Sequence, residues 1–461
     1  MSADGGDRGG AGDGPGAPGG AGPGDAPEDD RGRPPVPILA GRDAARWLEG
    51  LSRRAVDEAE QVDDAVRGIL EQVRREGDEA LLRLTEAHDG VRPRHVEVPP
   101  ARCRRALADL SAETREALER ARRNVERFHA AQRRREEPVE VEPGVTAWRV
   151  FRPLDLAGVY APGGRAPYPS SLLMAAVPAR VAGCREVVAC SPPGPDGLPA
   201  PAVMAAAALL DVDALYAVGG AQAVGAMAYG TESVPAVDKI FGPGSRWVNA
   251  AKLAVFRDVA VDLPAGPSEV AVWADAGADP VLVAAELLAQ AEHGPDSLAV
   301  GVLPERGLAE RVSAVLRERL EEAPRREAAA ESLARSALLV TEDGERAAAW
   351  VNELAAEHLV LLRDDAEEAL DRVRHAGSVF LGPHTPVAAG DYASGTNHVL
   401  PTRLRSRGAG GLGLDDFGKW MQVQRMDARG IRSLGPTIAA LAEWEGFPAH
   451  AASVRVRTEA T

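Results

Sequence analysis

The stretch Leu156-Ala-Gly-Val-Tyr-Ala161, together with the apolar segment from Ser170 to Val181, decides the fold class of this chain. The first part is a short apolar run that ends in a Pro-Gly-Gly turn, and the second has the length of a helix. A second apolar run, Glu186–Ala189, completes a strand–helix–strand unit. Strands that alternate with helices in this way form parallel sheets covered by helices.

The same alternation continues towards the C-terminus. We expect further strands at 214–218, 239–242, 269–273, 298–303, 337–341, 358–362 and 378–381. We expect helices between them at 201–210, 221–230, 246–255, 280–293, 307–320, 346–353 and 365–376. The sequence therefore predicts an α/β protein with two Rossmann-like α/β domains with parallel sheets, plus small N-terminal and C-terminal helical extensions.

Shifts in composition suggest the domain boundaries. Residues 1–35 are rich in Gly, Pro, Ala and Asp, which cannot bury enough apolar surface to fold, so we expect a disordered tail. The first α/β domain is expected to be discontinuous, built from residues 36–159, with amphipathic helices, and 269–405. The second is expected over 160–268, and a helical C-terminal tail over 406–461.

Composition also limits the binding partners and the cellular compartment that we expect for this protein. The chain has 461 residues and a net charge of −16, which argues against binding to nucleic acid. It shows no signal peptide and no run of ~18 apolar residues, so we expect no membrane segment. The three cysteines, Cys103, Cys184 and Cys190, are too few for a disulfide scaffold, and Cys184 and Cys190, which flank a predicted strand, are expected to be buried packing residues. These features favour a reducing, cytoplasmic location.

Two possible metal ligands lie at the end of one predicted helix. Gln290 and His293 are three residues apart, so they share a helix face. Asp279 can cap this helix, and Gly294-Pro295 ends it. A solvated helix end is the alternative interpretation of the pair.

Other polar groups are candidates for proton chemistry or ligation. Glu357 and His358 lie at a helix-to-strand junction, where adjacent side chains can reach one cavity and provide two proton acceptors. Asp391, in a polar loop, is a possible oxygen ligand, and His398 could lie behind such a ligand or contact the substrate. In the C-terminal tail, His450 is a fourth candidate ligand. The set Gln290, His293, Asp391 and His450 offers nitrogen and oxygen donors that suit zinc or a similar divalent ion.

Three glycine-containing turns follow predicted strands, at residues 161–165, 218–222 and 242–247. None is a complete G-x-G-x-x-G fingerprint, and each alone is more often a simple tight turn. Because ligands of open α/β sheets bind at the carboxyl ends of strands, the three together indicate a nucleotide site in the domain 160–268.

Seven blocks in order along the chain resemble the histidinol dehydrogenase family. They are Gly158–Gly164, Phe241–Gly244, Asp262–Val270, Gln290–Ser297, Glu357–Leu359, Ala389–Thr402 and Ala449–His450. The resemblance runs from about residue 37 to 458. It implies an NAD-dependent and zinc-dependent homodimer that oxidises L-histidinol to L-histidine, the last step of histidine biosynthesis, through an aldehyde and with two NAD and one water.

The resemblance also implies roles for individual residues. Glu357 and His358 would be catalytic, and one zinc ion per subunit would be bound at Gln290, His293, Asp391 and His450. Substrate would be contacted by Ser268, Gln290, His293, His358, Asp391, Glu445 and His450. NAD would be contacted by Tyr160, Gln222 and Ser245, the last commonly Asn in the family. The tail would complete the site of the partner subunit.

The chemistry is consistent with these roles. His358 can take the proton of an alcohol as its carbon gives up hydride, and Glu357 can take a proton from the water that adds to the aldehyde. Three alternatives remain at this point: a related dehydrogenase acting on another small hydroxylated substrate such as sulfopropanediol, a zinc hydrolase and a non-catalytic nucleotide-binding module. The glycine turns and the lack of an H-E-x-x-H motif argue against the hydrolase.

Overall fold

The computed structural model describes residues 35–57, 62–163, 167–263 and 266–459. The predicted disordered tail lies outside the described residues, apart from Pro35. Residues 164–165 of the first predicted glycine turn and residues 264–265 of the block Asp262–Val270 also lie outside them. Among the described residues, no helix combines the length and apolar character that crossing a bilayer requires.

The first of two parallel sheets has five strands in the order β6-β5-β4-β7-β8. Its strands are β4 (Leu156–Tyr160), β5 (Glu186–Ser191), β6 (Ala214–Ala217), β7 (Lys239–Phe241) and β8 (Ala260–Val261). Its helices are α6 (Pro169–Ala182), α7 (Pro201–Leu209), α8 (Gly220–Tyr229) and α9 (Arg246–Val255). Alternate residues of β5 explain the two covered faces, since Val187 packs in the core with α6 and α7, and Val188 in the core with α8 and α9.

The connections of this sheet place a topological switch at its centre. From β4 the chain moves outwards through β5 to β6, and it then returns to β7 on the other side of β4. The loops after β4 and β7 therefore diverge to opposite faces of the sheet. Such a switch point is the usual ligand site of an open α/β sheet.

Four N-terminal helices pack against the helices of this five-stranded sheet. They are α2 (Asp63–Glu76), α3 (Asp78–Asp89), α4 (Pro100–Ala108) and α5 (Ala112–Ala130). Helix α2 packs on α8 and α9, α4 on α7, and α5 on α6. We had expected residues 36–159 to belong with the other sheet, and the boundary at 159/160 falls inside β4. The division into domains stays a prediction, and these contacts favour grouping α2–α5 with the five-stranded sheet.

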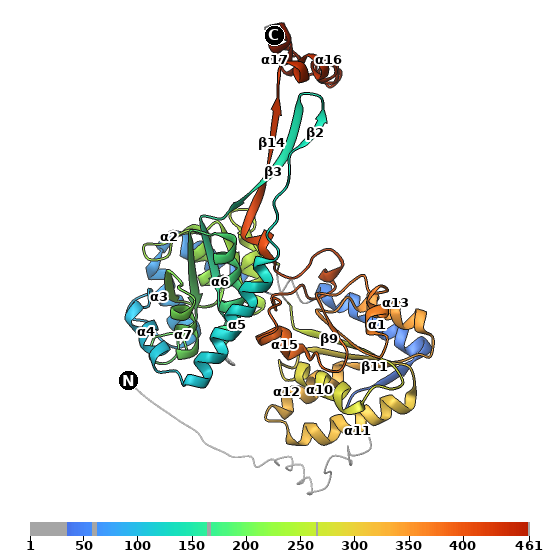
Figure 1. Ribbon diagram of the computed structural model, residues 1–461. Coiled ribbons are helices and arrows are strands. Elements are labelled where there is room, and N and C mark those ends of the chain that lie inside the picture. Colours follow the sequence, from blue (N-terminus) through green and yellow to red (C-terminus); the bar gives the residue numbers. More distant parts are fainter. Residues whose placement is uncertain (1–34, 58–61, 164–166, 264–265, 460–461) are drawn as a thin grey trace, which may run out of the picture. The chain divides into compact units, whose positions relative to one another are not determined.

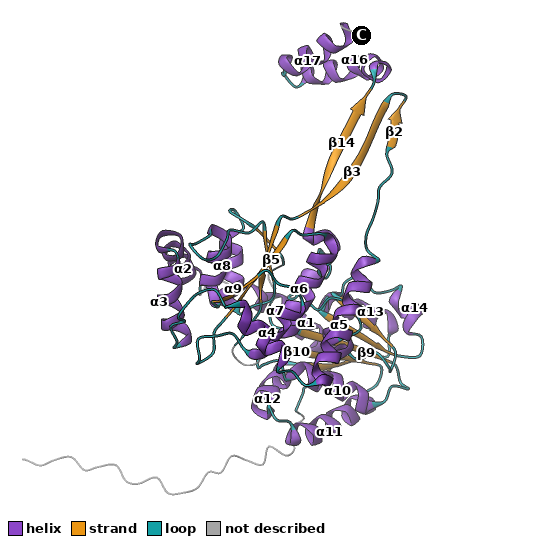
Figure 2. Cartoon of the chain, turned by 60° about the vertical axis from the view of Figure 1, so that its left-hand side comes forward, coloured by secondary structure: helices purple, strands orange, loops and turns teal. Residues whose placement is uncertain are grey.

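The second sheet has six parallel strands in the order β1-β11-β10-β9-β12-β13. They are β1 (Ile38–Ala40), β9 (Glu269–Ala274), β10 (Leu298–Leu303), β11 (Ala337–Val340), β12 (His358–Leu362) and β13 (Ser378–Leu381). The covering helices are α1 (Gly41–Asp57), α10 (Pro280–Ala291), α11 (Arg306–Glu322), α12 (Arg326–Arg335), α13 (Gly344–Leu354) and α14 (Ala366–Leu370). Helices α10–α12 cover one face, and α1, α13 and α14 the other. The predicted α/β fold class is therefore confirmed, as the strands and helices in Figure 2 show.

The C-terminal segment differs in part from the expected helical tail. It contains the short helices η2 (Arg405–Arg407) and η3 (Leu414–Phe417), strand β14 (Gly418–Met426), and helices α16 (Ala428–Trp444) and α17 (Pro448–Glu459). Strand β14 pairs antiparallel with β3 (Val145–Pro153), which pairs with β2 (Val139–Glu142), and Figure 1 shows β14 and β3 side by side. The sequence analysis missed this ribbon because its partners are far apart in the chain and its apolar residues bury little surface.

Candidate active site

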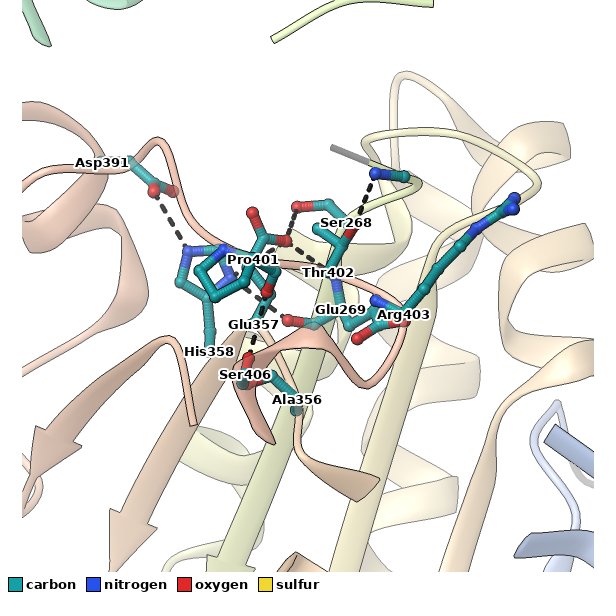
Figure 3. A network of polar contacts seen from close by, with 11 residues as sticks. Ser268, Glu269, Ala356, Glu357, His358, Asp391, Pro401, Thr402, Arg403 and Ser406 are labelled. Atoms are coloured by element: carbon teal, nitrogen blue, oxygen red, sulfur yellow. Dashed lines mark hydrogen bonds and ion pairs between the residues drawn. The ribbon is translucent and has the colours of Figure 1, made fainter. Parts of the chain in front are cut away.

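The candidate catalytic residues lie at the amino ends of β9 and β12, two neighbours in the six-stranded sheet. Ser268 directly precedes β9, Glu357 directly precedes β12, and the two strands are paired in parallel. Ser268 Oγ donates a hydrogen bond of 2.6 Å to Glu357 Oε2, and the backbone N–H of Glu269 donates one of 3.0 Å to the same oxygen (Figure 3). The Glu357 carboxylate is therefore buried and held in one orientation.

His358, the first residue of β12, is buried beside this carboxylate. Its Nδ1 lies 3.2 Å from the carbonyl oxygen of Glu269. Because a carbonyl can only accept, this contact assigns the proton to Nδ1 and leaves the lone pair on Nε2. Nε2 lies 3.5 Å from Asp391 Oδ1, which belongs to helix α15 (Val387–Tyr392). In the neutral ring, Nε2 is therefore the nitrogen that can accept a proton, and a proton gained there would lie between His358 and the carboxylate of Asp391.

Burial and neighbouring charges shift the pKa values of the side chains in this cluster. Burial raises the pKa of Glu357, although His358 and Ser268 oppose the shift. Burial and the neighbouring Glu357 charge raise the pKa of Glu269 to about 8. Burial opposes protonation of His358, but Glu357 and Asp391 together raise its pKa. Burial also opposes ionisation of Asp391, yet the hydrogen bond and charge of His358 hold the pKa of Asp391 below its usual value. Groups with such shifts are typical of functional sites.

The two predicted ligands Gln290 and His293 lie at and just beyond the C-terminus of α10, at the same edge of this sheet. Asp279 caps the helix, its side chain accepting from Val281 N at 2.8 Å, as expected from the sequence. Gln290 is buried near the C-terminus of α10, and its Nε2 has no hydrogen-bond partner among the described residues. His293 lies just beyond the helix and interacts electrostatically with Asp391.

Helix α15, which carries Asp391, is held by two further contacts. Glu286 lies one turn before Gln290 on α10, and its Oε2 accepts from Val387 N at 3.1 Å. His398 Nδ1 lies 2.9 Å from the carbonyl oxygen of Asp391. The sequence analysis singled out His398 as a neighbour of Asp391 but missed Glu286 and Glu269. The spacing of four residues between Glu286 and Gln290 was the available signal for Glu286.

The remaining candidate ligand, His450, and its neighbour Glu445 lie in the α16–α17 region. Both are exposed, and the contacts given for His450 are local, to the ring of Phe447 and within its own helix. In the described residues, no group of three or more His, Cys, Asp or Glu side chains is placed to hold a metal ion. Glu445 and His450 therefore have no shown contact with Asp391 or His358 in the single chain.

The three predicted NAD contacts lie at or just after the carboxyl ends of β4, β6 and β7 in the other sheet, and β4 and β7 flank its switch point. Tyr160 ends β4, and its hydroxyl accepts from Gly220 N at 3.2 Å at the start of α8. Gln222 is buried in α8, and Ser245 is exposed at the position that caps α9. A dinucleotide could approach the backbone closely at these turns.

The cysteines are not candidates for a nucleophile. All three are buried and free. Burial raises the pKa of Cys184 to about 11 and raises that of Cys190 further. Thiols held in the protonated form are weak nucleophiles, which agrees with the packing role expected from the sequence.

A glycine-rich switch point in one parallel sheet and a buried Glu–His pair at the edge of another are together typical of a nucleotide-dependent dehydrogenase. Residues 52–458 match the family model described as histidinol dehydrogenase. The chain is 46% identical over 412 residues to histidinol dehydrogenase from Vibrio parahaemolyticus, covering 89% of this chain and 95% of that protein. It is 45% identical over 413 residues to histidinol dehydrogenase from Methanothermobacter thermautotrophicus, covering 89% and 97%.

A solved structure agrees with these similarities. The crystal structure of histidinol dehydrogenase from Elizabethkingia anophelis matches with a TM-score of 0.89 and 38% identity, covering 93% of this chain and 99% of that one. The chain belongs to the histidinol dehydrogenase family. Its activity is the NAD-dependent oxidation of histidinol to histidine in histidine biosynthesis. The family and activity expected from the sequence are thus confirmed.

Proposed function

We propose that the chain oxidises L-histidinol to L-histidine in two successive hydride transfers through an aldehyde, using two NAD, one water and one zinc ion per subunit. The observation that carries this proposal is the joining of Ser268, Glu357 and His358 at the amino ends of β9 and β12. Two proton acceptors of different basicity lie there in one buried place, as a reaction with both an alcohol and a water to deprotonate requires.

His358 and Glu357 would divide the proton transfers. His358 Nε2, which carries the lone pair, would take the hydroxyl proton of histidinol as the carbon passes its hydride to the first NAD. Glu357 would take a proton from the water that adds to the aldehyde. His358 would then accept the hydroxyl proton of the hydrate as the second hydride leaves to the second NAD. Glu357 is oriented for its step by the hydrogen bonds from Ser268 and Glu269 N.

The residues at the end of α10 fit a zinc ion. Gln290 has a buried amide with an atom that has no partner in the described chain, and its oxygen and nitrogen are interchangeable by rotation of the amide. Asp391 is kept ionised by its neighbours. With His293 and His450, these residues form a nitrogen and oxygen donor set that suits zinc. When bound, zinc would hold the imidazole and amino nitrogens of the substrate.

The NAD site would lie at the switch point of the five-stranded sheet, with contacts from Tyr160, Gln222 and Ser245. Support for this placement comes from the positions of these residues, Tyr160 at the end of β4, Gln222 after β6 and Ser245 after β7. Because Ser245 has a shorter side chain than Asn, one hydrogen bond worth ~0.5–1.5 kcal/mol could be lost. That loss would weaken NAD binding without changing the reaction.

We also propose that the protein is a homodimer with shared active sites. The α16–α17 region carries large exposed apolar side chains, and Trp444 is 84% exposed. Such a patch on a small helix pair favours burial against a second copy of the chain. The tail of one subunit would then bring His450 to the zinc of the other. It would also bring Glu445 to the substrate's imidazole, as a hydrogen-bond acceptor. A cytoplasmic location stays a prediction from composition and cysteine content.

The test combines metal analysis with a stoichiometric assay. Purified protein loaded with zinc and given NAD and L-histidinol should form about two NADH per histidine, as a four-electron oxidation by a two-electron carrier requires. NADH formation with sulfopropanediol and not with histidinol would favour the related dehydrogenase. Absence of NADH with both would contradict the proposal.

A further inference from the structure

A fully buried ion pair lies beside the turn that follows β7. The side chain of Lys252, on α9, is 0% exposed and that of Asp262, just after β8, is 2% exposed, and the two charged groups are in contact. Burying two charges costs free energy, and apolar replacements of such pairs are often neutral or stabilising. Stability alone therefore does not explain the pair, and its other contacts indicate its role.

The ion pair binds both backbone polar groups of one residue, Gly242. Lys252 Nζ donates to the carbonyl oxygen of Gly242 at 2.6 Å, and the N–H of Gly242 donates to Asp262 Oδ2 at 2.6 Å. Nearly one turn earlier on α9, Asn249 Nδ2 donates to the carbonyl oxygen of Gly244 at 3.1 Å. Three side chains thus hold the backbone of the turn Gly242-Pro243-Gly244.

This turn is packed closely against the end of β4. Gly242 has a φ of +112°, and a side chain at this position would collide with the carbonyl oxygen of Tyr160. The Tyr160 hydroxyl in turn accepts from Gly220 N at 3.2 Å. The ends of β4 and β7 and the turn after β6 are therefore joined by direct contacts at the switch point of the sheet.

We infer that Lys252 and Asp262 are positioning residues for NAD, which hold the turn 242–244 so that its backbone and Ser245 face the cofactor. This inference rests on the proposed NAD site. Lys252 is fully buried, and Gly242 and Asp262 both bind its ammonium group. It therefore acts through the turn rather than as a partner of the cofactor's phosphates.

The test replaces the pair without leaving a buried charge alone. In Lys252→Met/Asp262→Asn, the KM for NAD should rise at least about tenfold, equivalent to about 1.4 kcal/mol. The kcat at saturating NAD, the KM for histidinol and the zinc content should stay close to wild type. The matched control is Leu210→Ala, a buried residue directly after α7 at the opposite edge of the same sheet. It should lower the melting temperature without changing the KM for NAD.

A second variant keeps the inference testable if the double variant misfolds. Asn249→Ala removes the contact with Gly244 and leaves the ion pair in place, and it should raise the KM for NAD about threefold. An unchanged KM for NAD in both variants would overturn the positioning role, provided that Ser245→Ala or Gln222→Ala raises it. If Ser245→Ala and Gln222→Ala also leave it unchanged, the proposed NAD site itself is wrong.

Discussion

Ser268 and Glu357 lie at the amino ends of two adjacent parallel strands and are joined by a hydrogen bond of 2.6 Å from the hydroxyl to Oε2. Open α/β sheets usually bind ligands at the carboxyl ends of their strands. In the six-stranded sheet, the candidate catalytic residues lie at the amino ends of the strands instead. The carboxyl edge of the five-stranded sheet carries the candidate NAD contacts. The two proposed sites thus use opposite ends of their sheets.

Removing the Ser268 hydroxyl should raise the pKa of Glu357, because this hydroxyl donates a hydrogen bond to the carboxylate. Hydrogen bonds to charged groups contribute about 1.5–3 kcal/mol, and one pKa unit corresponds to about 1.4 kcal/mol. In Ser268→Ala, we expect the acidic limb of the kcat–pH profile for oxidation of the aldehyde to move up by about one pH unit. The control is Ser336→Ala, which removes a buried hydroxyl directly before β11 of the same sheet, one that donates to Ser332 O at 2.8 Å. An unmoved limb in Ser268→Ala would contradict the orientation of Glu357 by this bond.

Glu357→Gln should separate the two oxidations. The amide keeps the volume and can still accept from Ser268, but it cannot take a proton from water. We expect the ratio of NADH formed to histidinol consumed to fall from about two towards one, with the aldehyde trapped by a hydrazine reagent. The exposed Glu345→Gln serves as the control and should keep a ratio of two. A ratio of two in Glu357→Gln would show that another group activates the water.

Gln290→Ala should weaken zinc binding by at least about tenfold, because groups that bind or support a metal ligand contribute this much to affinity. We expect chelation to abolish wild-type activity and added zinc to restore it and to raise the melting temperature, since zinc binds only the folded protein. The rise should be smaller in Gln290→Ala. Competition with a fluorescent chelator measures the affinity directly. Gln72→Ala, on α2, is the control, and equal affinities in both variants would exclude Gln290 as a ligand.

Mixed dimers test whether the tail serves the partner subunit. His450→Ala and Glu357→Ala should each form no histidine alone, and histidine formation is the activity compared here. If sites are shared, a heterodimer of the two has one intact site, so random mixing should restore about a quarter of wild-type activity. Subunits with different affinity tags allow the heterodimer to be isolated and assayed. No recovery in isolated heterodimers would mean that each tail completes its own subunit's site.

Ionisation of Glu269 should lower the free energy of unfolding as the pH rises. Its folded-state pKa of about 8 lies above the ordinary value of 4.5, so its contribution to stability is full below about pH 4.5 and is lost as the pH rises through about 8. Glu269→Gln cannot ionise, and its amide oxygen can still accept from Arg403 N. Relative to wild type, the variant should become more stable between pH 5 and pH 8.5, by on the order of a few kcal/mol.

Urea unfolding at equal protein concentration measures this difference, since a dimer's stability depends on concentration. The surface variant Glu310→Gln, on α11, should show no such trend with pH. A parallel pH dependence of wild type and Glu269→Gln would show that Glu269 is not buried as a neutral carboxyl.

Local patterns were enough to predict most elements of the two sheets. Strands such as β10 and β12 are continuous apolar runs, and helices such as α10 carry a capping residue and a Gly-Pro stop. The ribbon of β2, β3 and β14 was missed for the opposite reason. Its residues are largely exposed or only half-buried, and β14 is stabilised by pairing with β3, far away in the sequence.

The candidate site likewise contains residues that the sequence predicted and residues that only the structure revealed. Residue types and the resemblance to a family pointed to Ser268, Glu357, His358 and Asp391. The structure places these four side by side, with successive polar atoms 2.6, 3.6 and 3.5 Å apart. Glu269 was not predicted as a site residue, because its raised pKa depends on burial beside Glu357 and not on any local motif. The hydrogen bonds of Lys252 and Asp262 with the backbone of Gly242 were likewise not predictable from the sequence.

The sequence by itself determined the fold class, the family and the chemical types of the groups available for catalysis, because periodicity, turn residues and motif spacing are local properties of the chain. Only the tertiary structure decided which edge of each sheet those groups occupy, which carboxyl groups have raised pKa values and which nitrogen of His358 bonds to the backbone. Those properties arise from burial and from contacts between residues about 90 positions apart, such as Ser268 and Glu357, and these exist only once the parallel strands have paired.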